Sequence, residues 1–339
     1  MMQRLLIALL ANLVLVGGAA AARDRLQIVS SVATFPYAAT VSERFARTTH
    51  YPAPRVLMTG TGAGLRMFCA GLGPDYPDIV GANRPMSDQE FERCRQQGIR
   101  SITEFKIGHN GIVFAKAEGA NTMNLSKHAL FAAIAKHVIV DGHVVENPHR
   151  TWKDVDPALP NQRIEVVGPP PGSPLRDSFL GLVMAEGCMQ HPGIDTLSAD
   201  RRDEVCTMIR TDGRYVQAPE NSVEVVQRLH KRRHAVGILD CVAYELFEDL
   251  LDANALDGVA PDFETISDGR YSASFALYMY VKNQHYSDVP GMLAFVNEQT
   301  SERAFGPEGY LTDDGLIPLN PADRLAARAT AIGLNPMFR

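Results

Sequence analysis

A glycine-rich stretch, Gly60-Thr61-Gly62-Ala63-Gly64, constrains the fold more than any other feature of the chain, because it joins a predicted strand directly to a predicted helix. Residues 54–58 form a short apolar strand, and residues 65–68 begin the helix. Glycines at such a junction allow a tight turn in which successive N–H groups point outward at the positive end of the helix dipole. A second loop, residues 168–179, also leads into a helix. This pattern predicts an α/β fold that binds a small anion through backbone groups.

The N-terminus has the features of a secretory signal. Arg4 precedes an apolar stretch, residues 5–16, and Ala20-Ala21-Ala22 resembles a small-residue cleavage site. The alternative is a retained anchor, but Asn12 and the following glycines weaken residues 5–22 as a membrane span. No cysteine lies near the cleavage site, which argues against a lipid anchor. We expect residues 1–22 to be removed and the mature protein to be exported.

The charge balance limits the partners. The whole chain has 33 basic and 39 acidic residues, and loss of Arg4 with residues 1–22 leaves 32 basic residues and a net charge of −7. An acidic chain without a basic stripe is a poor candidate for binding nucleic acid or anionic lipid. An anion would have to be bound locally, by backbone N–H groups and one or two arginines.

Five cysteines are present, and none forms a C-x-x-C pair, so a zinc or redox centre is not indicated. Cys69 and Cys94 lie on predicted helices that flank an apolar segment, and Cys188 and Cys206 bracket a loop rich in proline and glycine. In an exported chain we expect the disulfides Cys69–Cys94 and Cys188–Cys206, each closing a loop of about 20 residues and contributing about 2–4 kcal/mol. Cys241 is expected to be a buried free thiol.

Strands and helices alternate along the chain, which predicts sheets with helices on both faces. The expected strands are residues 26–31, 55–58, 79–81, 163–167 and 235–239, with long extended segments at 102–115 and 271–281. The expected helices are residues 37–49, 64–70, 88–97 after a Ser87 cap, 126–137, 178–187, 220–232, 289–300 and 321–332. About 317 mature residues exceed one typical core, so two lobes are expected. The two long extended segments would connect them as a hinged clamp.

The chain resembles the phosphate-binding subunit of the bacterial phosphate ABC transporter, a type II periplasmic substrate-binding protein, over nearly the whole mature chain. The resemblance lies in Thr34-Phe35-Pro36, Gly60–Gly64, Ala82-Asn83-Arg84-Pro85, Lys106–Val113, Thr151–Val155, Pro157–Pro160, Arg176–Phe179, Ala218–Asn221, His234–Gly237, Tyr278–Lys282 and Gly306–Tyr310. It implies a two-lobed α/β fold in which residues 23–108 and 282–339 form one lobe and residues 109–281 the other. It also implies a monomer with no cofactor, no metal and no enzyme activity, which binds inorganic phosphate and delivers it to permease subunits.

The resemblance also implies a set of ligand-binding residues. The positions that match the family's site are Thr34, Phe35, Thr61, Gly62, Asn83, Arg84, Gly172, Ser173, Arg176 and Asp177. Several alternatives stay open: Thr61 could be a plain capping threonine, and Ala33 could replace Thr34. Arg84 could form a surface ion pair, and Arg176 with Asp177 could form an exposed pair at a helix start. His109 and Asn110 could line the cleft or be solvated.

The second loop departs from the family. Where relatives have Ser-Gly-Thr, this chain has Ser173-Pro174-Leu175, so proline removes an N–H donor and leucine removes a hydroxyl. Asp240 replaces part of a Gly-Tyr turn, and its charge would repel phosphate. Two lost donors could cost several kcal/mol in binding a dehydrated anion.

Three functions compete. The first is a phosphate receptor for an ABC permease. The second is a divergent paralogue that senses phosphate or binds another ligand or a protein, which the Ser173-Pro174-Leu175 departure favours. The third is an exported hydrolase, but G-x-S-x-G and H-E-x-x-H motifs are lacking.

Overall fold

The computed structural model describes residues 23–218 and 222–339. The predicted signal peptide, residues 1–22, and the predicted start of a helix at Glu220 lie outside these residues. Within them, no helix combines the length and the apolar character needed to cross a bilayer.

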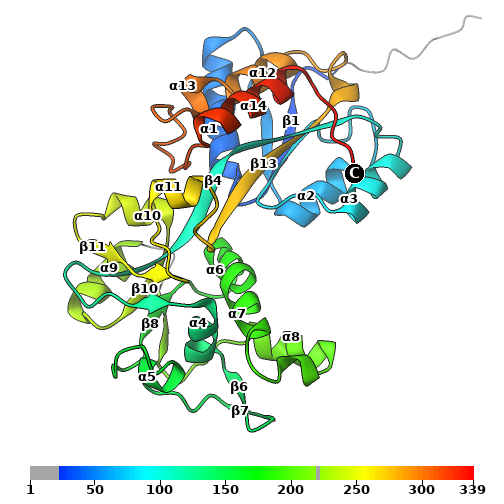
Figure 1. The fold of residues 1–339 in the computed structure, drawn as a ribbon. Helices are drawn as coiled ribbons and strands as arrows, with labels where there is room; N and C mark the ends of the chain where they lie inside the picture. The colour runs from blue at the N-terminus through cyan, green and yellow to red at the C-terminus, as the bar shows by residue number, and fades with distance from the viewer. Residues whose placement is uncertain (1–22, 219–221) are drawn as a thin grey trace, which may run out of the picture.

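A single long strand, β4 (Ile102–Ala117), runs through both halves of the molecule (Figure 1). Its residues 102–111 pair with β13 (Ser274–Lys282), and residues 112–115 pair with β10 (Val236–Asp240). Near its middle, Leu316 and Ile317 approach so closely that a Cβ on Gly108 would lie within 2.7 Å of them, which requires glycine there. The two extended crossovers predicted from the sequence are therefore β4 and β13.

The first lobe surrounds the part of the sheet ordered β2-β1-β3-β13-β4. The strands not yet given are β1 (Gln27–Ser30), β2 (Arg55–Met58) and β3 (Ile79–Ala82). One face packs against α1 (Phe35–Thr48), α12 (Met292–Gln299), α13 (Glu302–Phe305) and α14 (Pro321–Ile332). The other face packs against α2 (Thr61–Phe68) and α3 (Asp88–Gln96). A 3₁₀ turn, η3 (Asn283–His285), follows β13.

The second lobe continues the same sheet beyond β4 in the order β10-β8-β9, and β11 also pairs with β4. These strands are β8 (Val166–Gly168), β9 (Tyr215–Gln217) and β11 (Leu251–Ala253). Two further pairs form small separate sheets: β5 (Asn124–Leu125) with β12 (Ala255–Leu256), and β6 (His137–Val140) with β7 (His143–Glu146). Its helices are α4 (Lys127–Ile134), α5 (Trp152–Val155), α6 (Pro174–Phe179), α7 (Ala185–Met189), α8 (Ala199–Thr207), α9 (Ser222–Lys231), α10 (Cys241–Leu246) and α11 (Phe263–Ser267). A π-helical turn, η1 (Leu180–Met184), joins α6 to α7, and a 3₁₀ turn, η2 (Ile194–Thr196), precedes α8.

The predicted α/β class with two lobes is confirmed, whereas the lobe boundaries at 108/109 and 281/282 stay a prediction. Several element bounds were wrong, and three of the differences have a clear physical reason. The helix predicted over 126–137 ends at Ile134, because the β-branched run from His137 forms β6. The helix predicted from Ser178 begins at Pro174, because Ser173 caps it. The helix predicted from Gly64 begins at Thr61, so most of the glycine-rich stretch is already helical.

Both predicted disulfides are confirmed. Cys69 bonds to Cys94 at a sequence separation of 25, and Cys188 bonds to Cys206 at a separation of 18. Cys241 is free and buried, also as predicted. Each lobe therefore has one covalent link between neighbouring helices.

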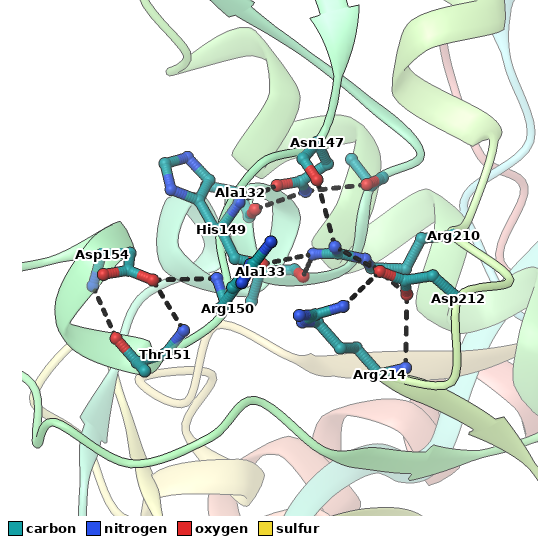
Figure 2. A network of polar contacts seen from close by, with 11 residues as sticks. Ala132, Ala133, Asn147, His149, Arg150, Thr151, Asp154, Arg210, Asp212 and Arg214 are labelled. Atoms are coloured by element: carbon teal, nitrogen blue, oxygen red, sulfur yellow. Dashed lines mark hydrogen bonds and ion pairs between the residues drawn. The ribbon is translucent and has the colours of Figure 1, made fainter.

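Arg210 holds together the end of α4 and the segment that follows β7 (Figure 2). Its guanidinium donates to the backbone oxygens of Ala133, Asn147 and His149 at 2.9 to 3.1 Å. It also forms a two-bond ion pair with Asp212, at 2.9 and 2.6 Å. Since the last carbonyls of a helix have no partner within it, Arg210 supplies donors that α4 itself lacks.

We predict that Arg210→Ala lowers the free energy of unfolding by about 2–4 kcal/mol, because several carbonyls and Asp212 lose their donor. The control is Arg201→Ala, which removes only an exposed ion pair with Glu204 on α8 and is expected to cost less than about 1 kcal/mol. Urea unfolding followed by circular dichroism measures both. Equal costs for the two variants would contradict this role of Arg210.

Candidate functional site

A cavity of about 360 Å³ is lined by residues of both lobes. The starts of three helices contribute residues to its lining. These are the loop before α1, the first turn of α2, and α6. The lining residues are Ser31, Val32, Ala33, Gly60, Thr61, Asn83, Arg84, Pro174, Asp177, Ser178, Gly181, Leu182 and Phe275. We refer to it as the anion cavity.

The start of α2 offers unpaired backbone donors to the anion cavity. Gly60 precedes the helix with φ +83°, a conformation that favours glycine, and it provides no side-chain cap. The Gly64 N–H bonds to the Gly60 carbonyl, whereas the N–H groups of Thr61, Gly62 and Ala63 have no acceptor among the described residues. Three such N–H groups at a helix N-terminus favour an anion.

Thr61 and Asn83 are joined by two hydrogen bonds beside these donors. The Thr61 hydroxyl donates to Asn83 Oδ1 at 2.6 Å and accepts from the Asn83 backbone N–H at 3.1 Å. This pairing occupies the Asn83 oxygen and leaves its Nδ2 without an acceptor in the described part of the chain. The Asn83 side-chain amide can therefore donate to a ligand.

Arg84 lines the same cavity and is also held by an ion pair. Its two terminal nitrogens each donate to a Glu90 carboxylate oxygen at 2.8 Å, while its side chain stays 46% exposed. The Arg84 guanidinium lowers the pKa of Glu90 to about 2. Arg84 thus forms the surface ion pair that the sequence left open as an alternative, and it also lines the cavity.

The second lobe presents one face of the helix that begins with α6. The residues on the cavity are Pro174, Asp177, Ser178, Gly181 and Leu182, a spacing that places them on one side of a helix. Arg176 lies on another face: its side chain donates to the Pro169 carbonyl at 3.0 Å and lies over the Tyr215 ring. Since Pro174 has no N–H and Ser173 caps the Arg176 N–H at 3.1 Å, this helix offers fewer donors than α2.

The ten residues predicted from the sequence do not all meet. Thr61, Asn83, Arg84 and Asp177 line the anion cavity, and Ser173 lines a neighbouring cavity. The linings of both cavities leave out Thr34, Phe35, Gly62, Gly172 and Arg176. Thr34 is fully buried, and its hydroxyl bonds to those of Ser30 and Ser31. Whether each residue binds a ligand stays a prediction.

Sequence reasoning missed several lining residues. Ser178 stands four residues after Pro174, so helical spacing could have identified it once the helix start was placed correctly. The sequence indicates Ala33 only as an alternative to Thr34. Phe275 comes from β13, and no local pattern indicates that it reaches the cleft.

A second, larger cavity of about 500 Å³ adjoins the first. The two share Val32, Ala33, Pro174, Ser178 and Phe275. Asn110 and Asp240 also line the second cavity, as the sequence suggested, and burial raises the pKa of Asp240. His109 is buried rather than solvated, and burial lowers its pKa to about 4, which keeps the ring neutral at pH 7.

We predict that Arg84→Gln makes the protein less stable by about 1 kcal/mol at pH 7, a figure reduced for the exposure of Arg84. Because the folded-state pKa of Glu90 is depressed, its stabilisation is present above the ordinary value of 4.5 and is lost as the pH falls towards 2. The difference between variant and wild type should therefore shrink from pH 5 to pH 2 in denaturant titrations. The control is Arg47→Gln, whose partner Glu43 is exposed; a constant difference for Arg84→Gln would contradict the prediction.

Comparisons with known proteins agree with this architecture. A family model described as a PBP superfamily domain matches residues 17–303. The phosphate-binding protein PstS of Staphylococcus saprophyticus is 24% identical over 85% of this chain and 78% of its own. Protein SphX of Synechococcus elongatus is 24% identical over 78% of this chain and 70% of its own.

Solved structures show the same fold. A possible phosphate binding protein from Planctomyces limnophilus superposes with a TM-score of 0.70 at 21% identity, covering 92% of this chain and 98% of that one. An ABC-type phosphate transport receptor from Vibrio cholerae gives 0.63 at 15% identity, covering 88% and 100%. With a family match over most of its length and a two-lobed fold around one cleft, the chain belongs to the periplasmic-binding-protein (PBP) superfamily.

Proposed function

We propose that the protein captures inorganic phosphate, or a similar oxyanion, between its lobes and delivers it to an ABC permease. The observation that carries this proposal is that Thr61, Asn83 and Arg84 line one cavity at the start of α2, whose first three N–H groups have no acceptor among the described residues. A tetrahedral oxyanion needs many hydrogen-bond donors once it loses its water. Hydrogen bonds that involve a charged group contribute most to the free energy of binding. The names of the curated relatives support phosphate as the first ligand to test.

Binding would draw the lobes together. The first lobe supplies most of the donors, and the second supplies Ser178 and the start of α6. An anion held by the first lobe would attract the donors of the second, and β4 and β13 would bend between them. The family is one of substrate-binding transport proteins, and we propose a binding role without catalysis.

The proposal also includes export of the protein. We propose that residues 1–22 are a cleaved signal peptide and that the mature protein acts in the periplasm as a monomer. The proposed partners are the anion and the permease subunits.

A second candidate is a divergent paralogue that senses phosphate or binds a different ligand. Pro174 removes a donor at the start of α6, Leu175 is apolar, and Asp240 adds a carboxylate to the adjoining cavity. These features weaken the second lobe as a partner for bare phosphate.

Calorimetric titration of the mature protein with phosphate separates the transport role from a paralogue that binds a different ligand. The transport role predicts that phosphate binds with a dissociation constant in the micromolar range or below. Sulfate is titrated as a competing oxyanion. Intact folding without phosphate binding would favour the second candidate.

We predict that Thr61→Val weakens phosphate binding about 10- to 100-fold, because it removes a hydroxyl from the cavity and releases Asn83. The same calorimetry measures this change. The matched control is Thr207→Val on α8, an exposed threonine whose hydroxyl bonds only to the backbone of Asp203. An unchanged affinity in Thr61→Val would contradict a role of the Thr61–Asn83 pair in binding.

A further inference from the structure

The 500 Å³ cavity beside the anion cavity has room for more than a solvated ion. Its volume falls within the range of sites for organic ligands, roughly 300–1,000 Å³. It opens onto the anion cavity along a shared wall that includes Pro174, Ser178 and Phe275. One ligand could therefore occupy both cavities. We refer to this second space as the tail cavity.

Most of the residues that line the tail cavity are apolar. The apolar side chains are Val32, Pro36, Pro174, Leu175, Val225, Ile238, Leu239, Val242, Ala243, Leu246 and Phe275. Leu175 is the residue that replaces a hydroxyl-bearing residue of the family, so the departure seen in the sequence makes part of this wall. Such a surface favours an alkyl chain over a hydrated ion.

The charges of the tail cavity are of one sign. Asp240 and Asp314 line it, and no lysine, arginine or histidine is among the described residues that do. Within residues 23–218 and 222–339, neither carboxylate forms an ion pair. Asp240 accepts only from the Ala243 N–H at 2.7 Å, and Asp314 only from the Thr40 hydroxyl at 2.6 Å. Each carboxylate therefore has acceptor capacity left for a cationic partner.

Tyr37 adds an unused polar group. Its side chain is 2% exposed and lines the tail cavity, yet its hydroxyl makes no hydrogen bond within the described residues. Burial raises the pKa of this phenol, and the negative charges of Asp240 and Asp314 raise it further. The aromatic rings of Tyr37 and Phe275 are also suitable neighbours for a cation.

We propose that the protein binds a tetrahedral phosphorus oxyanion that carries a short alkyl chain ending in an ammonium group. The oxyanion occupies the anion cavity at the start of α2. The chain passes Pro174 and Phe275, and the ammonium lies between Asp240 and Asp314. This inference rests on the proposed function of the anion cavity and names its substrate class.

The charge pattern explains this choice. Bare phosphate gains little from the tail cavity, because two carboxylates repel it and most of the wall is apolar. A ligand with charges at both ends meets donors at one cavity and carboxylates at the other.

Calorimetry on the mature protein tests the proposal with three sets of ligands. The probes are ω-aminoalkylphosphonates of two to four carbons, the alkylphosphonates of the same length, and inorganic phosphate. We expect at least one aminoalkylphosphonate to bind about tenfold or more tightly than its matched alkylphosphonate and than phosphate. Phosphate esters of the same amino alcohols form a further arm, which distinguishes an ester from a phosphonate as the source of the oxyanion.

The variant Asp240→Asn locates the ammonium. Asparagine keeps the cap on α10, so the fold is retained, and circular dichroism checks it. We expect the advantage of the amine over its matched alkylphosphonate to fall about tenfold, while alkylphosphonate binding is not weakened, because the variant removes a carboxylate that repels the anion. The matched control, Asp313→Asn, changes a neighbouring carboxylate outside the tail cavity and should change neither.

The outcomes separate the two proposals. Tight phosphate binding with no advantage for any amine would overturn this inference and leave the proposed function intact. No binding of any phosphorus oxyanion would overturn the proposed function itself. An amine advantage that survives Asp240→Asn would overturn the placement of the ammonium.

Discussion

The hydrogen-bonded ladder of β4 is the constraint on which the rest of the structure depends. One continuous strand pairs with β13 in the first lobe and with β10 and β11 in the second, so the two lobes share a backbone rather than a loose linker. This sharing sets the starts of α1 and α2 opposite the start of α6 (Figure 1). A cleft lined by helix N-termini follows from that arrangement, and α2 gives it unpaired donors. A bend in two strands, rather than a rearrangement of either core, would be enough to close the cleft.

The two sides of the cleft differ in their electrostatics. The first lobe contributes unpaired N–H groups and Arg84, whose ion pair with Glu90 holds the guanidinium at the edge of the anion cavity. The second lobe contributes an apolar wall and Asp240, whose buried carboxylate has a raised pKa. A receptor for bare phosphate alone would gain from donors on both sides. The asymmetry therefore points to a ligand whose two ends differ in charge, and it gives a physical reason for the unusual Ser173-Pro174-Leu175 loop.

Much of the fold could be predicted because its signals are local. The Ser87 cap is followed three residues later by Glu90, and the structure shows the complete capping box. The two disulfides followed from cysteines placed on flanking elements of an exported chain. The site was harder to predict, because adjacency in sequence is not adjacency in space. Arg176 and Asp177 are neighbours in the chain, but on a helix they differ by about 100° in direction, so one side chain turns towards Tyr215 and the other towards the cleft. Phe275 reaches the same cleft only through the pairing of β13 with β4, which no local pattern encodes.

The most direct test of the central claim is a crystal structure of the mature protein grown with phosphate. The structure predicts one phosphate in the cleft, with its oxygens accepting from the N–H groups of Thr61, Gly62 and Ala63 and the lobes closed over it. A different concave surface on the first lobe carries Arg44, Arg47 and Arg303 and lies outside the cleft. Phosphate bound only there, with the start of α2 left without an anion, would contradict the claim.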